Sequence, residues 1–358
     1  MSVLIQLREY FTFHLKPHLA PTERIPYPVK IFIYQLIIII LTSGLSLEQY
    51  DQQSMAQELL QLAAIYSGSD DHPHCGGDVP GQPRRPNEGV LHLGLRQVGN
   101  RTVLYDCYAH VPLRVLRPVY LDDTGTAYLY LLNPCGGVLG GDTYTIQATL
   151  DAGAQAYVTT PSATKLYAAP NQPACQQLDF TVHDSAVLTY LPEPTIPFAN
   201  AAFRQHMTVR LGAGACAFLG EILAPGRMAR DEMFAYREYR ASLQVEDAHG
   251  DVLLIDRTRL HPQRDDLRAL GMLEGYSYLG TFYALGDHTA LDAARAPALH
   301  HLLDGDPHLV GSATTLAQGG IAIRFLADTP MSANQALYRI YNLLRQQVLG
   351  HPAAPRRL

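Results

Sequence analysis

The stretch Asn133–Asp142, Asn-Pro-Cys-Gly-Gly-Val-Leu-Gly-Gly-Asp, concentrates residue types that can do chemistry. It combines a thiol at Cys135, a carboxylate at Asp142 and the glycine pairs Gly136-Gly137 and Gly140-Gly141. Glycine pairs allow positive φ angles or the close approach of another surface. A phosphate-binding loop would need Lys-Ser/Thr and a helix after its last glycine, and a dinucleotide fingerprint also needs a helix. An alternating strand follows here instead, so we interpret the stretch as a shaped corner between two strands.

The candidate residues allow two alternative hypotheses in which the chain is an enzyme. Cys135 could act as a nucleophile, but this needs a histidine base nearby, and no local pattern supplies one. Glu193 and Glu221 could serve as the paired carboxylates of a carbohydrate-active β-helix hydrolase or lyase, although the sequence does not give their separation. For each residue taken alone, a surface charge at the end of a loop is the plainer interpretation.

The possible metal ligands of the chain are dispersed. The five cysteines are odd in number and include no CxxC pair, and the 15 histidines include no HExxH. This pattern argues against a disulfide framework and a zinc ribbon, and it favours a reducing compartment. His72, His74 and Cys75 lie together and could catch a soft metal, but on a linker without further ligands the incidental interpretation is favoured.

The composition separates the first quarter of the chain from the rest. Ile31–Leu45 is almost wholly apolar but is shorter than the roughly 20 residues of a membrane span, and it lies too far in for a signal peptide. Residues 47–66 have the spacing of an amphipathic helix, and residues 67–89 are a Pro- and Gly-rich linker. We therefore predict an atypical N-terminal extension over residues 1–89, no membrane association, and a working unit over residues 90–358. The net charge of −6 excludes a broad nucleic-acid footprint.

A weak repeat organises the working unit. Three strand-turn-strand segments share an alanine after the turn, at Ala154, Ala186 and Ala215, which are 32 and 29 residues apart. Such a repeat predicts a mainly β fold, with a β-helix or solenoid-like superhelical core of stacked strands. A sandwich of regular hairpins remains the alternative. Further strands are expected at residues 253–256 and within residues 272–326.

Each repeat ends in a polar loop, at residues 159–167, 191–198 and 220–232. If the coils stack, these loops share one edge of the solenoid. This edge would then bring together five charged side chains: Lys165, Glu193, Glu221, Arg227 and Glu232.

A final helix is expected near the C-terminus. Ser332 or Asn334 can cap it, and Gly350 with Pro352 can end it. Its apolar stripe consists of Leu337, Ile340, Leu344 and Val348. We expect this helix to pack on the β core.

Taken together, these residues resemble the urease accessory proteins called UreD or UreH. Four motifs carry the resemblance in order: Asn133–Asp142, Thr159–Tyr167, Tyr190–Phe198 and Glu221–Glu232. Pro112-Leu113 and Gly319–Arg324 also fit. The resemblance covers roughly residues 90–350 and leaves residues 1–89 outside. The Pro-Arg ending usual in the family is matched only in part, by Pro355–Leu358.

The resemblance implies a β-helix-like superhelix and a non-catalytic scaffold in urease maturation. It implies that the chain joins a helical UreF-type protein and a UreG-type GTPase on apo-urease and assists nickel insertion. The GTPase partner would hold the nucleotide, which accounts for the missing Walker lysine. No tightly bound cofactor is expected, because nickel would be handled in transit, and the location implied is cytoplasmic. A purely structural β domain is the third alternative after the sugar enzyme.

The resemblance also implies which residues form the functional surface. The candidates for partner binding or nickel passage are Cys135, Gly136, Gly137, Gly140, Gly141, Asp142, Thr160, Lys165, Tyr167, Glu193, Glu221, Arg227 and Glu232. Carboxylate and thiol groups suit weak, transient Ni²⁺ contacts, so Asp142, Glu193, Glu221 and Cys135 are the candidates for the passage. For Asp142 we favour the passage over a turn cap, because aspartate is costly at a β-rich position unless something polar needs it.

Overall fold

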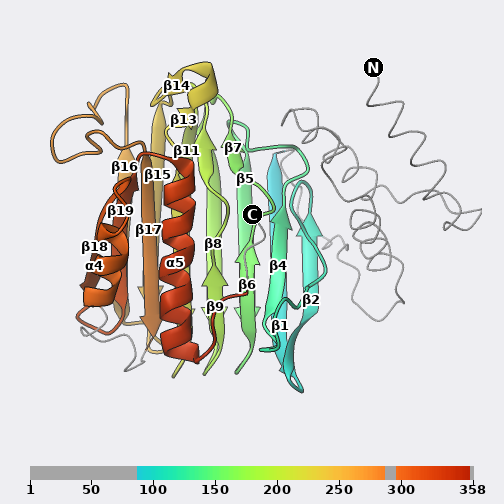
Figure 1. Ribbon diagram of the computed structural model, residues 1–358. Coiled ribbons are helices and arrows are strands. Elements are labelled where there is room, and N and C mark those ends of the chain that lie inside the picture. Colours follow the sequence, from blue (N-terminus) through green and yellow to red (C-terminus); the bar gives the residue numbers. More distant parts are fainter. Residues whose placement is uncertain (1–86, 287–295, 355–358) are drawn as a thin grey trace, which may run out of the picture. The chain divides into compact units, whose positions relative to one another are not determined.

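The computed structural model describes residues 87–286 and 296–354 of the chain. These residues form two β-sheets with helices on one outer face (Figure 1). The apolar segment Ile31–Leu45, the expected helix 47–66 and the His72/His74/Cys75 cluster lie outside the described residues. The boundary proposed near residue 89 therefore stays a prediction. Neither described helix is long and apolar enough to cross a bilayer.

The first sheet has seven strands. In spatial order they are β16 (Val252–Leu260), β15 (Glu238–Glu246), β11 (Ala202–Leu211), β8 (Ala174–Val182), β5 (Thr143–Leu150), β1 (Glu88–Val98) and β2 (Arg101–His110). The five strands from β15 to β1 are parallel, and an antiparallel strand closes each end.

The second sheet faces the first. Its main path runs through β18 (Leu309–Thr315), β19 (Ile321–Ala327), β17 (Tyr278–Gly286), β12 (Cys216–Leu223), β9 (Val187–Tyr190), β6 (Gln155–Thr159), β4 (Ala127–Leu132) and β3 (Arg114–Val115). Two short strands, β7 (Thr164–Leu166) and β10 (Thr195–Pro197), pair with each other, and β10 also pairs with β12. A separate hairpin joins β13 (Gly226–Arg227) to β14 (Glu232–Met233), with a 3₁₀ turn at Met228–Arg230 between them.

The chain passes from one sheet to the other and back, which makes a β-solenoid of about four turns. Successive coils stack in register, as shown by the row Ile146, Leu178, Met207 and Leu243 across four neighbouring strands. These side chains are buried between the sheets. The predicted solenoid-like core is confirmed, and within the two large sheets antiparallel pairing occurs only at the ends among the described strands.

The repeat read from the sequence marks the tight turns of the coils. Ala154, Ala186 and Ala215 are all at most 1% exposed. The residue before each alanine has a positive φ, 73° at Gly153, 57° at Ser185 and 65° at Gly214. The turns also bond to one another, because Gly153 N donates to Asp184 O at 3.0 Å and Ser185 N to Ala213 O at 2.9 Å. The alanine spacing therefore measures the length of one coil.

Two helices cover the outer face of the second sheet: α4 (Ala296–Asp304) and α5 (Pro330–Leu349) (Figure 1). The predicted stripe of α5 is correct at Leu337, Ile340 and Leu344, which are at most 2% exposed. The predicted N-caps Ser332 and Asn334 were wrong, because Thr329 caps the helix by accepting from Ser332 N at 3.1 Å. The predicted end at Gly350 is confirmed, since Gly350 is the C-cap with a positive φ of 76°. Pro330 can occupy the first turn because no N–H is needed there.

Candidate functional site

The long loops of the solenoid all leave the same edge, opposite the tight turns. They join β6 to β8, β9 to β11 and β12 to β15, and the Asn133–Asp142 corner joins β4 to β5 beside them. We call this edge the motif edge, defined by residues 133–142, 160–167, 193–198 and 227–232. It lies at the top of Figure 1, where β7, β13 and β14 are labelled.

Backbone hydrogen bonds join the motifs from one coil to the next. Val138 N donates to Lys165 O at 2.8 Å, which ties the glycine corner to β7. The residues of β7 then pair with those of β10, with Lys165 opposite Ile196. Ala224 N donates to Thr195 O at 2.9 Å and extends the series to the third loop. Motifs far apart in sequence thus form one continuous backbone ladder.

Side chains repeat this connection on the surface. The Tyr167 hydroxyl donates to Gly136 O at 3.4 Å, and the Tyr167 ring meets the Phe198 ring edge-on at 5.0 Å between centroids. Arg227 Cζ lies 3.9 Å above the centre of the Phe198 ring. Arg227 Nε donates to Glu232 Oε2 at 2.8 Å. A row of alternating aromatic and charged groups therefore runs along the motif edge.

The Arg227–Glu232 pair fixes the charges at the end of this row. The hydrogen bond from Arg227, followed by one from Ala199 N at 3.1 Å, holds the pKa of Glu232 below its ordinary value. The bond to Glu232 likewise raises the pKa of Arg227. An ionised, bonded carboxylate is a poor general acid, so the pair is suited to shaping a contact surface.

The four glycines of the corner are needed for two different reasons. Gly136 and Gly141 have positive φ angles of 79° and 88°. A Cβ on Gly137 would lie 2.5 Å from Tyr167 Cε2, and one on Gly140 would lie 2.6 Å from Ala169 Cα. The prediction that a Cβ would be blocked by backbone conformation or by contacts is confirmed at these positions.

Replacing Gly140 with valine is expected to lower the free energy of unfolding by about 1–3 kcal/mol, because the backbone of Ala169 cannot easily give way. Urea denaturation followed by circular dichroism measures the change. Gly275→Val is the matched control, since no atom lies within 4 Å of a Cβ built on Gly275. Equal losses in both variants would contradict the close-approach explanation.

Asp142 caps the turn that precedes β5. Its Oδ2 accepts from Leu139 N and from the Tyr144 hydroxyl, both at 2.8 Å, and the residue is 8% exposed. Asn133 Nδ2 adds a bond to the Tyr144 oxygen at 3.1 Å. This geometry supports the capping role, which the sequence interpretation had ranked second. A role for Asp142 in nickel passage stays a prediction.

Asp142→Ala is expected to destabilise the chain by about 2 kcal/mol, because hydrogen bonds to a buried carboxylate are lost. The melting temperature measures this effect, and Asp123→Ala, at an exposed position, is the control. An unchanged melting temperature for Asp142→Ala would show that the cap is unimportant for stability.

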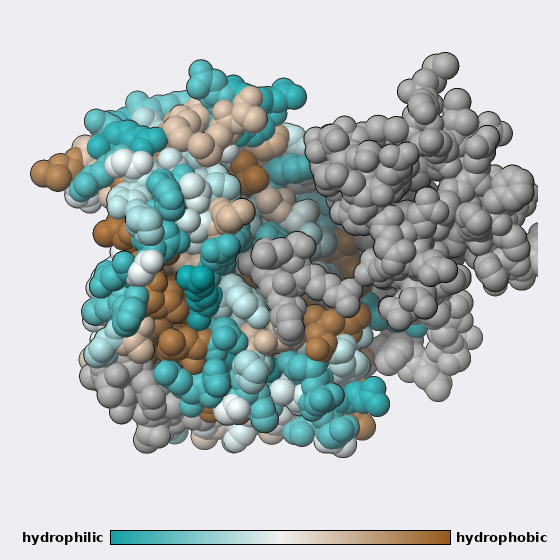
Figure 2. Space-filling model, viewed as in Figure 1, coloured by the Kyte–Doolittle hydropathy of each residue, from teal (hydrophilic) through white to brown (hydrophobic). Residues whose placement is uncertain are grey.

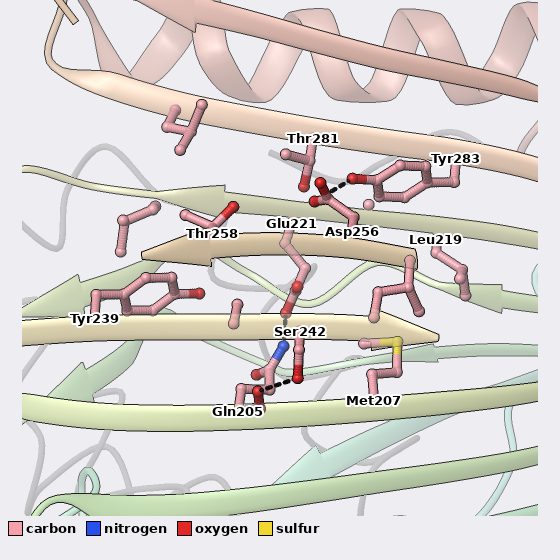
Figure 3. A pocket seen from close by; sticks show the side chains of 15 residues that line it. Gln205, Met207, Leu219, Glu221, Tyr239, Ser242, Asp256, Thr258, Thr281 and Tyr283 are labelled. Carbon is pink, nitrogen blue, oxygen red and sulfur yellow. Dashed lines mark hydrogen bonds between the residues drawn. The ribbon is translucent and has the colours of Figure 1, made fainter. Parts of the chain in front are cut away.

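Glu221 does not lie on the motif edge. It points from β12 into a cavity of about 40 Å³ between the two sheets, which β11, β15, β16 and β17 also line (Figure 3). Gln205 Nε2 donates to Glu221 Oε1 at 2.7 Å. Burial raises the pKa of Glu221, and the Gln205 bond only partly opposes this. The volume suffices for a few water molecules.

A second carboxylate lines the same cavity from the facing sheet. Asp256 on β16 accepts from the Tyr283 hydroxyl at 2.7 Å and from Arg324 at 2.8 Å. The cavity is thus lined by Glu221, Asp256 and neutral polar groups, with aliphatic side chains around them. Oxygen donors of this kind suit weak cation contacts.

The expected meeting of five charged side chains on one edge was therefore wrong for Glu221. Glu193 lies instead in the loop before β10, where its N–H bonds Thr160 Oγ1 at 3.0 Å, and it does not line the cavity. The two carboxylates therefore do not line this cavity together, and the paired-carboxylate sugar enzyme stays a prediction.

The cysteines show one difference from the sequence expectation. Cys107 is disulfide-bonded. Cys135 is free and exposed on the motif edge, and no imidazole among the described residues hydrogen-bonds its sulfur. Within residues 87–286 and 296–354, no three His, Cys, Asp or Glu side chains are grouped to hold a metal ion.

Comparison with known proteins decides the family. The family model described as UreD urease accessory protein matches residues 87–358. The chain belongs to the UreD family. It is 34% identical to the urease accessory protein UreD of Actinomyces naeslundii over 74% of this chain and 96% of that protein. It is 30% identical to the UreD proteins of Bacillus cereus, over 73% and 94%, and of Cenarchaeum symbiosum, over 75% and 95%.

Membership of the UreD family explains the ordered motifs, but the cavity residues were missed by sequence reasoning. The cavity residues Gln205, Asp256 and Tyr283, and Arg324 that pairs with Asp256, are not among the site residues predicted from the sequence. The sequence does indicate two of them. Asp256 lies two residues from Leu254, and Gln205 two residues from Phe203, so each polar residue shares a strand face with an apolar one. Polar residues that share a strand face with apolar neighbours point inward, where they need polar partners.

Proposed function

We propose that this chain is a scaffold in urease maturation, which joins a UreF-type helical protein and a UreG-type GTPase on apo-urease. The observation that carries the proposal is the motif edge, where four separate motifs form one continuous surface of paired backbone, aromatic rings and fixed charges. None of its described side chains forms a nucleophile–base pair or a metal cluster. Such an edge is suited to contact and not to turnover.

Exposed apolar side chains on and next to the motif edge support a docking role. Leu139 and Met228 are 54% and 45% exposed, and Leu270 and Met272 on the neighbouring loop are 92% and 41% exposed. That loop lies beside the edge, because Arg268 Nη2 on the loop donates at 3.1 Å to Sδ of Met233, the residue that follows the edge. In the view of Figure 2, hydrophilic residues and separate apolar groups share the described surface.

Nickel enters this proposal as cargo, handled in transit toward the active site of urease. The cavity around Glu221 supports transit, because it offers carboxylate, amide and hydroxyl oxygens without a preformed cluster of strong ligands. Among the four passage candidates, only Glu221 lines this cavity. Weak contacts favour release, which delivery requires.

Capture of purified partners tests the scaffold. The full chain, immobilised, is expected to retain the UreF-type protein, and through it the GTPase, and to retain apo-urease. A triple variant at exposed positions, Cys135→Ser/Leu139→Ser/Lys165→Ala, is expected to lose at least one partner, while Arg339→Ala on helix α5 keeps all of them. Failure of the wild-type chain to retain any partner would overturn the proposal.

The same preparation tests whether the chain is an enzyme. We expect no GTP hydrolysis by the isolated chain, because no phosphate-binding loop is present in the sequence. Turnover that copurifies with the chain and disappears in the Asp142→Ala variant would contradict a non-catalytic role.

A further inference from the structure

The outer face of the seven-stranded sheet has an uneven charge distribution. Because Tyr239, Asp256 and Thr258 line the interior cavity, their neighbours along β15 and β16 point outward. Five outward arginines lie on the three adjacent strands β11, β15 and β16, of which Arg210 at the far end of β11 pairs with Glu246 at 3.3 Å. We call the other four the arginine face: Arg204, Arg240, Arg257 and Arg259. No described helix or strand covers this side of the sheet, since α4 and α5 pack on the other sheet.

The strand register places these arginines directly side by side. Arg204 on β11 lies opposite Arg240 on β15, and Arg240 lies opposite Arg259 on β16. Arg257 is in the next row of the same face, opposite Ser242. Neighbouring strands are about 4.8 Å apart, so three guanidinium groups share a strip about 10 Å wide.

One carboxylate serves two of the four arginines. Glu238, whose side chain is only 10% exposed, pairs with Arg204 at 3.3 Å and also with Arg240. Arg257 and Arg259 are exposed, and neither forms an ion pair with a described residue. Like charges directly opposite each other on adjacent strands are unfavourable. The face therefore holds an excess of positive charge that an external anion would relieve.

The next two strands of the sheet, β8 and β5, differ in the charge of their outward residues. On β5 and β8 the outward residues are Thr143, Thr145, Gln147, Thr149, Cys175, Gln177, Asp179 and Thr181, without a single lysine or arginine. The arginine face is thus separated by two uncharged or acidic strands from Arg96 on β1 and Arg101 on β2, on a chain whose net charge is −6. Arginine also has the planar fork that binds carboxylates with two parallel hydrogen bonds.

We propose that the arginine face docks an acidic segment of a partner protein. The open strip is too flat to enclose a small anion, and its fixed spacing suits a row of carboxylates on an extended segment. His206 is the one aromatic side chain on the outward faces of β11, β15 and β16, so a run of unpaired bases would find a single stacking platform there, whereas several guanidinium groups are available to carboxylates. This proposal does not depend on the identity of the partners in urease maturation.

A fluorescent twelve-residue peptide of alternating glutamate and serine is the probe. With the full chain, anisotropy titrations at about 50 mM and 300 mM NaCl are expected to show binding that weakens at least about tenfold with salt. Arg257→Gln/Arg259→Gln is expected to weaken binding at low salt by about tenfold. Both side chains are exposed, so the melting temperature should stay unchanged.

Arg101→Gln/Arg339→Gln is the matched control, because it removes the same charge from two exposed positions away from the arginine face. Its affinity for the peptide is expected to stay within about twofold of wild type. Equal weakening in the two double variants, no binding by the wild-type chain, or tighter binding of a single-stranded RNA twelve-mer than of the peptide would each overturn the proposal.

Discussion

Replacing Arg345 with methionine is expected to lower the free energy of unfolding by about 3–5 kcal/mol. Arg345 is 2% exposed and lies in the last turns of α5, where it pairs with Asp122 at 3.3 Å. It also donates to Pro352 O and, at 3.4 Å, to Thr124 Oγ1. Methionine fills the space but leaves a largely buried carboxylate without its cation. The helix then loses its polar anchor to the loop before β4.

The dependence of this loss on pH follows from Asp122. Burial raises the pKa of Asp122, but hydrogen bonds from Thr124 and Tyr128 and the charge of Arg345 outweigh it, so the pKa lies below its ordinary value. A depressed pKa contributes stability above the unfolded value of about 3.9, and that stability disappears as the pH falls through the folded value. The difference between wild type and Arg345→Met should therefore shrink in acid.

Urea denaturation at pH 7 and at the lowest pH where both chains refold measures both effects. Arg339→Met, on the exposed side of the same helix, is the control and should change stability by less than about 0.5 kcal/mol. A loss that is the same for both variants, or that grows in acid, would contradict the role of the buried pair.

Much of the fold could be predicted because the coils repeat. Every coil must turn at the same place and bury the same face, so small residues such as Ala154, Ala186 and Ala215 recur at the turns and apolar residues alternate along the strands. The C-terminal helix was predicted for the same reason, since Leu337, Ile340 and Leu344 follow helical spacing. Positions that are buried at regular intervals in the structure therefore carry small or apolar residues at the same intervals in the sequence.

The remaining features depend on contacts that have no period. Helix α4 is short, and its burial is set by β18 and α5 rather than by a long stripe of its own. Glu221 was placed in a loop because the chain there reads Gly-Glu-Ile-Leu-Ala-Pro, but β12 continues to Leu223. In that longer strand, Glu221 shares the inward face of Leu219 and Leu223. Glu221 was therefore wrongly assigned to the motif edge because the predicted end of its strand was too early.

Glu221→Gln is expected to separate stability from function. The pKa of Glu221 is raised by burial above the unfolded value of about 4.3. A raised carboxyl pKa costs stability as the pH climbs from the unfolded value through the folded one, because the folded state holds the proton more tightly. Glutamine removes that cost and can still accept from Gln205. The variant should therefore melt higher than wild type at neutral pH and equally at pH 4.

Under the nickel-transit proposal, the same variant should activate urease poorly. Loss of the one carboxylate that β12 contributes to the cavity is expected to lower urease activity by about tenfold in a nickel-supplemented reconstitution with all partners. Partner capture should be normal, because Glu221 lies between the sheets and not on the motif edge. Asp304→Asn is the matched control, since Asp304 is exposed on α4, lies away from the motif edge and does not line the cavity, and its activation should stay within about twofold of wild type. Full activation by a folded Glu221→Gln chain would remove the cavity from the nickel path while leaving the scaffold role intact.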